Sequence, residues 1–284
     1  MGEIVLAAKN THVPSIWMSE NFEQFKGIRD HAIEGLSKIG DLARKRGADT
    51  FVIFDTHWIV NQAFHLNANA HLKGVFTSPE LPHFLDGMTY DYQGDPELAD
   101  LIVEAGADRD IRVRAHKSPS LGPEYGTLIP MHHMNRDGSI KVLSAAANQF
   151  ADIEEGKVFG EIVADAIRRS DRKVALLASG SLSHQFAPNR VSEGYLHKVY
   201  GDFNRQVDEH VLMLLTTGRI KDFLDMLPGY AQHCYGECGM IDTAHLFGAI
   251  GWDNYTGQGE YMSKYFGSSG TGQVNMVFNP PYAG

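Results

Sequence analysis

The sequence has little cysteine, a shortage of positive charge and no long apolar run, and each shortage argues against a class of protein. Only two cysteines occur, Cys234 and Cys238, which argues against a disulfide scaffold and favours a reducing cytoplasm. The net charge of -10 argues against a nucleic-acid partner, because phosphate binding needs a basic surface. No window approaches the roughly 20 apolar residues of a membrane-spanning helix, so we expect no membrane partner.

Strand-like and helix-like segments alternate along the chain, and we find no internal repeat. Apolar runs typical of buried strands lie at 4–8, 50–55 and 174–178, and weaker strand patterns lie at 63–68, 113–116, 141–145 and 273–278. Helical patterns lie at 24–45, 97–105, 157–169, 200–216, 220–226 and 240–249. This alternation predicts a single α/β domain over residues 1–284, with a central mixed sheet flanked by helices on both faces.

Histidine is the unusually frequent residue type, with 14 copies, and two of them follow predicted strands. His12 follows the first strand in KNTHVPS, and His57 follows the strand at 50–55 in FVIFDTHW. Ligands of α/β folds bind beyond the carboxyl ends of the strands, and imidazole is a common ligand of iron and zinc. Each histidine could also be a hydrogen-bonded loop residue. Asp55 is placed to orient the His57 ring or its loop.

Two further candidates lie in the second half of the chain. His184 follows the buried strand at 174–178 and a turn of small residues, in VALLASGSLSHQF. It is either a general acid–base, with an ordinary pKa near neutral pH, or a capped turn histidine. Glu237 stands between two glycines in HCYGECGMIDT. Its carboxylate either stabilises the N-terminus of the helix that follows, by its negative charge, or binds a metal.

Five motifs then occur in one order across roughly residues 3–278: KNTHVPS, FDTHW, SGSLSHQF, CYGECGMIDT and FGSSGTGQVN. Together they resemble the class III extradiol catechol dioxygenases. The resemblance implies that His12, His57 and Glu237 are a two-histidine, one-carboxylate set for Fe(II), which Mn(II) could also occupy. It implies that His184 is the acid–base beside the metal, and that the protein is a homo-oligomer.

The implied reaction inserts both atoms of O₂ into a catechol such as 3,4-dihydroxyphenylacetate and opens the ring beside the diol to a muconic semialdehyde. The sequence departs from the family at one point. Many relatives carry Asp-His-Gly in the middle of the chain, where this sequence has Glu124, Tyr125 and Gly126. Tyr125 replaces the histidine that lines the pocket in those relatives, so Tyr125 or the nearby His116 is expected to serve instead.

Three alternatives stay open on the sequence. The same chemistry could act on protocatechuate or an aminophenol, because no motif identifies the group beside the diol. A zinc hydrolase could use the same three ligands. A non-enzymatic binding protein could keep the fold without the reaction.

Overall fold

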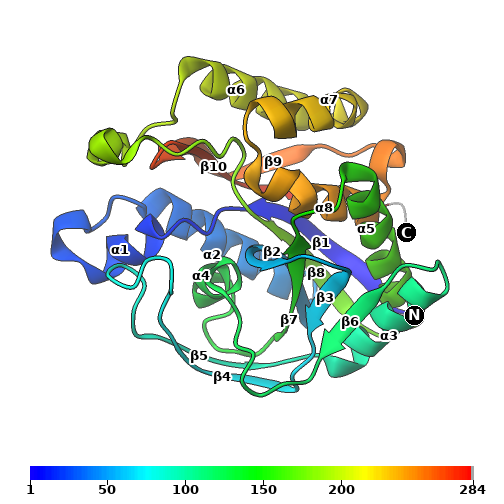
Figure 1. Cartoon of the computed structure of the whole chain (residues 1–284). Helices are drawn as coiled ribbons and strands as arrows, with labels where there is room; N and C mark the ends of the chain where they lie inside the picture. The colour runs from blue at the N-terminus through cyan, green and yellow to red at the C-terminus, as the bar shows by residue number, and fades with distance from the viewer. Residues whose placement is uncertain (283–284) are drawn as a thin grey trace.

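An eight-stranded mixed sheet runs through the middle of the structure, a computed structural model that describes residues 1–282 (Figure 1). Its strand order is β6-β3-β7-β2-β8-β1-β10-β9. The central strands pair in parallel, whereas β10 is antiparallel to both β1 and β9. The strands are β1 (Glu3–Asn10), β2 (Thr50–Val60), β3 (Phe64–Asn67), β6 (Val113–His116), β7 (Lys141–Asn148), β8 (Lys173–Ser179), β9 (Gly259–Ser268) and β10 (Thr271–Phe278).

Helices cover both faces of the sheet, so the predicted fold class is confirmed (Figure 1). One face packs against α3, α5, α6, α7 and α8, and the other against α1, α2 and α4. The helices are α1 (Ser15–Asn21), α2 (Asp30–Lys45), α3 (Pro96–Ala107), α4 (Tyr125–Met134), α5 (Ile153–Arg169), α6 (Asp202–Thr216), α7 (Ile220–His233) and α8 (Ile241–Ile250).

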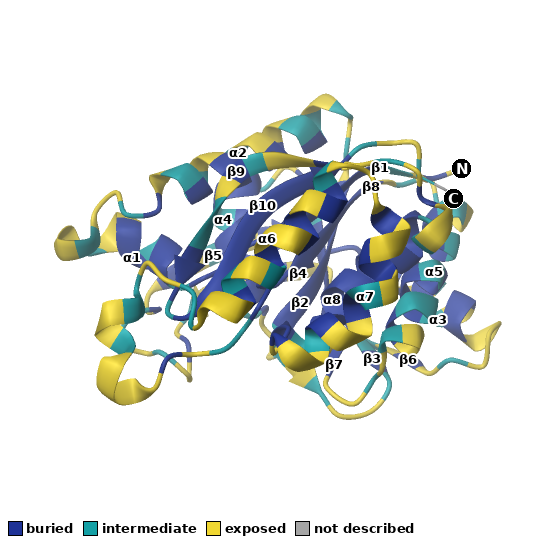
Figure 2. Ribbon diagram, turned by 90° about the horizontal axis from the view of Figure 1, so that it is seen from above, coloured by how far each residue is buried: buried dark blue, intermediate teal, exposed yellow. Residues whose placement is uncertain are grey.

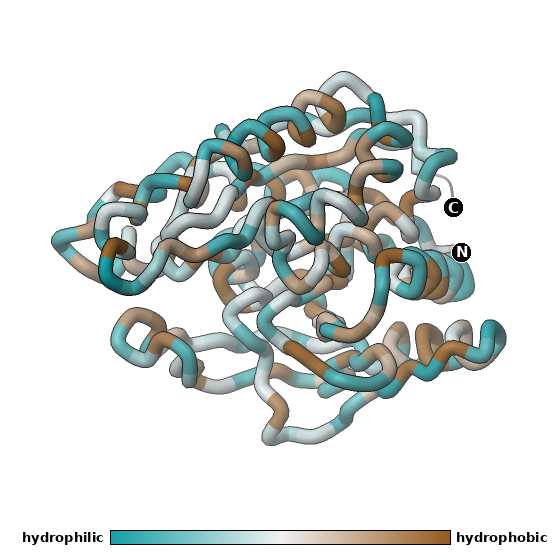
Figure 3. Tube along the Cα trace, turned by 45° about the horizontal axis from the view of Figure 1, so that its top comes forward, coloured by the Kyte–Doolittle hydropathy of each residue, from teal (hydrophilic) through white to brown (hydrophobic). Residues whose placement is uncertain are grey.

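Two hydrophobic cores form because alternate residues of a strand point to opposite faces. Within β2, Val52 and Phe54 enter the core beneath α5 and α8, whereas Phe51 and Ile53 enter the core beneath α2 and α4. A strand buried on both faces has no polar side, which is why 50–55 appears as a continuous apolar run. Figure 2 shows the buried strands between helices whose outer faces are exposed, and Figure 3 shows the apolar residues concentrated inside.

Several predicted boundaries are wrong. The helix expected at 220–226 continues as α7 to His233. The helix expected at 24–45 is a 3-10 turn at Glu23–Phe25, then a break, and then α2 from Asp30. Gly27 lies in the break with a φ of +79°, a left-handed conformation that glycine adopts without strain. The strand expected to end at Asp55 continues to Val60 after an irregularity in its pairing with β7.

Several elements were not predicted, and each has a sequence that hides it. β4 (His71–Phe76) and β5 (Met88–Gln93) form a separate antiparallel hairpin at the bottom of Figure 1, rich in exposed polar residues. α4 contains Pro130, which normally argues against a helix interior. α1 is a helix of only 7 residues, and β9 lies at the edge of the sheet.

Across residues 1–282, every helix is too short or too polar to cross a bilayer.

Candidate metal centre

The candidate ligands come from three segments that meet where the central parallel strands end. His12 lies two residues past the end of β1, and His57 lies within β2, just after Asp55. Glu237 begins a short 3-10 turn, Glu237–Met240, that leads into α8. Strands β2, β8 and β1 are neighbours in the sheet, so their carboxyl ends lie side by side. The topology therefore brings together residues that are far apart in the sequence.

His12, His57 and Glu237 are the one group of three or more potential metal ligands found among residues 1–282. Their ligand atoms all lie within 4.8 Å of one another. The Nε2 atoms of His12 and His57 lie 3.3 Å and 3.4 Å from the same oxygen, Oε1 of Glu237. Two imidazoles and one carboxylate that share a focus fit a divalent transition metal, so the donor set suits the metal implied by the sequence.

The Glu237 carboxylate is buried, and the backbone and side chains around it hold it in place. Its Oε2 accepts a hydrogen bond of 2.6 Å from the Ser181 backbone N–H, and its Oε1 accepts one from the Thr56 hydroxyl. The next three residues, Cys238, Gly239 and Met240, have positive φ angles of 45°, 65° and 61°. This left-handed succession turns the chain sharply between Glu237 and α8.

The charges and hydrogen bonds around Glu237 favour the ionised form of its carboxyl group. Burial alone raises the pKa of Glu237, but the charges of the surrounding histidines and the His12 hydrogen bond bring the pKa well below its usual range. Burial alone lowers the pKa of His57, but the hydrogen bond to Glu80 and the charge of Glu237 bring the net pKa above its ordinary value. A cation site requires an ionised carboxylate, and the lowered pKa of Glu237 favours that form.

His184 lies beside this group, as its proposed role requires. Its Nε2 is 3.7 Å from Oε2 of Glu237, and burial lowers the pKa of His184 below its ordinary value. The backbone N–H of His184 donates to the Cys234 carbonyl at 3.1 Å. Its neighbour Ser183 donates through both N–H and Oγ to the buried carboxylate of Asp208. The loop is thus held on two sides, which limits the positions that the ring can take.

Tyr125 also reaches the group, because it is the first residue of α4. Its ring centroid lies 3.8 Å from that of His57, and its hydroxyl donates to Oε2 of Glu80 at 3.1 Å. The same Glu80 oxygen lies 3.5 Å from Nδ1 of His57. Burial raises the pKa of Tyr125, so its phenol is neutral at ordinary pH. Tyr125 therefore acts as a donor that holds Glu80 against His57.

The structure does not bring His116 into this group. His116 ends β6, the edge strand of the sheet, and its Nε2 lies 3.0 Å from Nδ1 of His65 on the adjacent β3. His116 is also absent from the walls of the cavity beside the candidate ligands. Its nearness to Tyr125 in the sequence is lost because the loop between β6 and α4 carries the chain away from the edge of the sheet.

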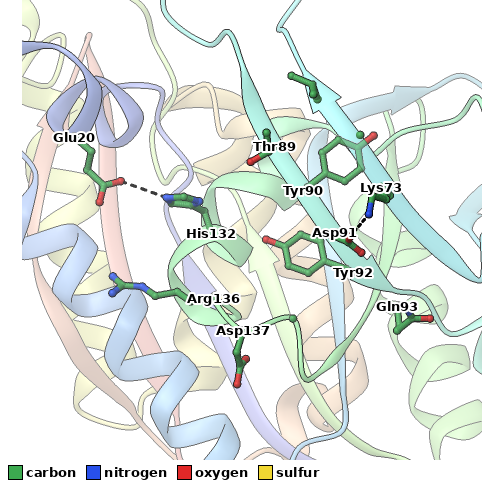
Figure 4. Close-up of a pocket in the computed structure, with 13 residues that line it drawn as sticks. Glu20, Lys73, Thr89, Tyr90, Asp91, Tyr92, Gln93, His132, Arg136 and Asp137 are labelled. Carbon is green, nitrogen blue, oxygen red and sulfur yellow. Dashed lines mark hydrogen bonds and ion pairs between the residues drawn. The ribbon is translucent and has the colours of Figure 1, made fainter.

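A cavity of about 790 Å³ opens beside the candidate ligands, large enough for a substituted aromatic ring. His12, His57, His184 and Tyr125 line it. A second cleft, of about 1090 Å³, lies between the β4–β5 hairpin and the end of α4 (Figure 4). Lys73 pairs there with Asp91 at 2.7 Å, and the lining of this cleft contains none of the candidate ligands.

The sequence indicates one of the groups that orient the ligands, Asp55, but not Ser179 or Glu80. Asp55 was expected to orient the ring or loop of His57, and its Oδ1 accepts the backbone N–H of His57 at 2.8 Å. Gly126 leaves the space this needs, since a Cβ there would lie 2.1 Å from Oδ1 of Asp55. Ser179 contacts Nδ1 of His12, and Glu80 contacts His57 from the unpredicted loop between β4 and β5. The small-residue turn after β8 was the only available signal.

The chain matches the sequence model of the family described as the catalytic LigB subunit of aromatic ring-opening dioxygenase, over residues 6–279. It belongs to that family and is a dioxygenase of this class, which confirms the resemblance seen in the five motifs.

Two curated relatives and one solved structure add detail. The chain is 46% identical to the 3,4-dihydroxyphenylacetate 2,3-dioxygenase of Escherichia coli, over 91% of this chain and 94% of that protein. It is 25% identical to the 2-aminophenol 1,6-dioxygenase beta subunit of a Pseudomonas species, over 100% of this chain and 96% of that subunit. An uncharacterized protein of Escherichia coli K12 shares the fold, with a TM-score of 0.67 and 17% identity over 97% of this chain and 100% of that one.

Proposed function

We propose that this chain is an extradiol dioxygenase that opens the ring of 3,4-dihydroxyphenylacetate beside its two hydroxyl groups. The product is a muconic semialdehyde that contains both atoms of O₂. The observation that carries the proposal is the convergence of His12, His57 and Glu237 beside a cavity, in a chain that is 46% identical to a dioxygenase named for this substrate. We further propose that residues 1–284 form one catalytic domain, which the family match over residues 6–279 supports.

The proposed metal is Fe(II), held by His12, His57 and Glu237, and Mn(II) suits the same donors. When bound, the metal lowers the pKa of the catechol hydroxyls and lets electron density pass between the ring and O₂. The protein supplies two neutral nitrogen donors and one negative charge, and the ionised state of Glu237 is already present without the metal. That leaves positions on the metal for two further ligands.

His184 is the proposed general acid–base. Its lowered pKa leaves the ring neutral at ordinary pH, so Nε2 can accept a proton from a catechol hydroxyl and later return it to an oxygen of the product. Tyr125 is a positioning residue in this proposal, because its neutral hydroxyl holds Glu80 beside Nδ1 of His57. Tyr125 stands where many relatives have a second pocket histidine. In this proposal His184 is therefore the one residue that accepts and returns the proton.

The proposal is tested by loading the metal-free full chain anaerobically with Fe(II), Mn(II) or Zn(II). O₂ uptake and the yellow ring-opened product are then measured with 3,4-dihydroxyphenylacetate. We expect equimolar use of O₂ and catechol with Fe(II), loss of activity in Glu237→Gln, and full activity in Glu260→Gln, an exposed carboxylate on β9. Hydrolytic activity with Zn(II) alone, or no O₂ uptake with any metal, would overturn it.

A second candidate substrate is an aminophenol, because one relative is named a 2-aminophenol 1,6-dioxygenase beta subunit. The same assay with 2-aminophenol decides between the two by the ratio of kcat/KM. We also propose that the chain forms a homo-oligomer, which light scattering of the purified protein tests. The cytoplasmic location stays a prediction.

A further inference from the structure

A buried guanidinium lies behind one wall of the active-site cavity. Arg29 directly precedes α2 and is only 2% exposed. Its Nε–H donates to Oγ of Ser15 at 2.8 Å, its Nη2 donates to the carbonyl of Leu196, and its Cζ lies 4.9 Å from the centre of the Phe266 ring. Ser15 and Leu196 both line the cavity. The guanidinium is thus separated from the cavity by a single layer of side chains.

No carboxylate pairs with Arg29 among residues 1–282, and burial is the sole cause that lowers its pKa, to about 10. It therefore keeps its charge at ordinary pH. Burying a charge without a counter-ion is costly, and natural proteins normally pair such a group. Hydrogen bonds to a hydroxyl and a carbonyl satisfy two donors but leave the charge uncompensated. This imbalance points to an anion that is absent from the chain itself.

The cavity wall needs a cation if its ligand is anionic. Glu80 and Glu193 line the cavity and Glu237 lies against its histidines, but its lining, all within residues 1–282, includes no lysine or arginine. A carboxylate that entered such a space would be repelled by charges of its own sign. Arg29 is a cation that contacts the lining directly through Ser15, so its charge can offset that repulsion.

Two serine hydroxyls connect the guanidinium to the cavity. Oγ of Ser15 lies 3.1 Å from Oγ of Ser268, which also lines the cavity. Ser15 accepts a hydrogen bond from Arg29 Nε, and this bond uses neither hydroxyl proton. Each serine therefore has its own hydroxyl proton, and the hydrogen bond between Ser15 and Ser268 uses one of the two. The other proton is free to donate to a ligand, and donation by a cation strengthens the next hydrogen bond along the chain.

We propose that Arg29, acting through Ser15 and Ser268, is a specificity-determining residue that selects catechols bearing an anionic side group, such as the carboxylate of 3,4-dihydroxyphenylacetate. The inference rests on the proposed function and narrows its substrate class. It also disfavours 2-aminophenol, which has no carboxylate for the serine pair to receive.

The test compares the wild type, Arg29→Gln and Arg29→Lys on 3,4-dihydroxyphenylacetate and on neutral 4-methylcatechol. We expect Arg29→Gln to lose about 10- to 100-fold in kcat/KM on the anionic catechol, the range of a charge-assisted hydrogen bond, and less than about 3-fold on the neutral one. Arg29→Lys should recover part of the preference. Arg44→Gln is the matched control, because Arg44, in the last turn of α2, likewise donates to a carbonyl, that of Met134. Equal losses on both catechols would show a purely structural role and overturn the inference.

A second measurement keeps the inference separate from the proposed function. Phenylacetate, which has no hydroxyls, should raise the Tm of the metal-free wild type more than neutral phenylacetamide does. Arg29→Gln should remove that difference, and so should Ser15→Ala with Ser268→Ala, which leaves Arg29 in place. If the wild type cleaves no catechol but keeps the difference, the proposed function fails and the anion site stands. If the wild type shows no difference between the two compounds, the anion site is refuted.

Discussion

Ser179 determines which nitrogen of His12 carries the proton, and this leads to a sharp prediction. Its hydroxyl donates to the Gly126 carbonyl at 2.5 Å, and its Oγ lies 3.2 Å from Nδ2 of Asn10 and 3.0 Å from Nδ1 of His12. The single serine proton is used on Gly126, so His12 must be the donor at Nδ1. A metal bound at the site would then take the lone pair of Nε2, with the Nδ1 proton held by Ser179.

The predicted perturbation is Ser179→Ala, which removes the acceptor and leaves the His12 ring free to rotate or change tautomer. Loss of such an orienting partner typically weakens metal binding by about 10- to 100-fold, which corresponds to about 1.4–2.7 kcal/mol. The variant also leaves the Gly126 carbonyl without its donor. That loss lowers the free energy of unfolding by about 1–3 kcal/mol in the metal-free protein.

Anaerobic titration of Fe(II) against a competing chelator measures the affinity, and urea denaturation of the metal-free protein measures the stability. Ser144→Ala is the matched control: Ser144 is buried in β7, and its Oγ has no hydrogen-bond partner among residues 1–282. We expect the control to bind Fe(II) as the wild type does. If Ser179→Ala also kept wild-type affinity, the argument from the His12 tautomer would be refuted.

Three further predictions follow from other parts of the structure. His184→Phe should keep its metal but lose ring cleavage by roughly 10²–10⁴-fold in a steady-state assay, and full activity would contradict the acid–base role. Asp95→Asn should lower the free energy of unfolding by about 3 kcal/mol at pH 7, because buried Asp95 accepts from Arg172 Nε at 2.7 Å. Burial opposes ionisation there, but Arg172 and the Leu98 N–H hold the pKa of Asp95 below its unfolded value of 3.8. The difference in free energy of unfolding between the wild type and Asp95→Asn, measured in urea, should therefore disappear as the pH falls below that value. A difference that persisted would argue against the ion pair. Burial lowers the pKa of His245 from 6.5 to about 4. Between these two pH values the unfolded chain binds more protons than the folded one, so the free energy of unfolding should fall by about 1.4 kcal/mol for each pH unit that the pH drops. His245→Phe should remove that slope, and an unchanged slope would refute the assignment.

Local patterns in the sequence revealed the parts of the fold that depend on neighbouring residues. The apolar run at 50–55 and the amphipathic run at 157–169 became β2 and α5, because burial on both faces leaves a continuous apolar run and burial on one face leaves a periodic one. The same reasoning failed at α4, where Pro130 lies inside a helix that packing holds together. It failed again at β4 and β5, whose outward side chains are polar.

The sequence by itself determined the chemistry that the site can carry. His12, His57, His184 and Glu237 could be singled out because strand ends and glycine turns mark where an α/β protein binds its ligands, and the order of five motifs identified the family. Only the tertiary structure decided which other groups join them. It brought Glu80 to His57 and a buried Arg29 to the cavity wall, and it left His116 at the edge of the sheet. Such contacts depend on how distant segments pack, and distant packing leaves no periodic signal in either segment.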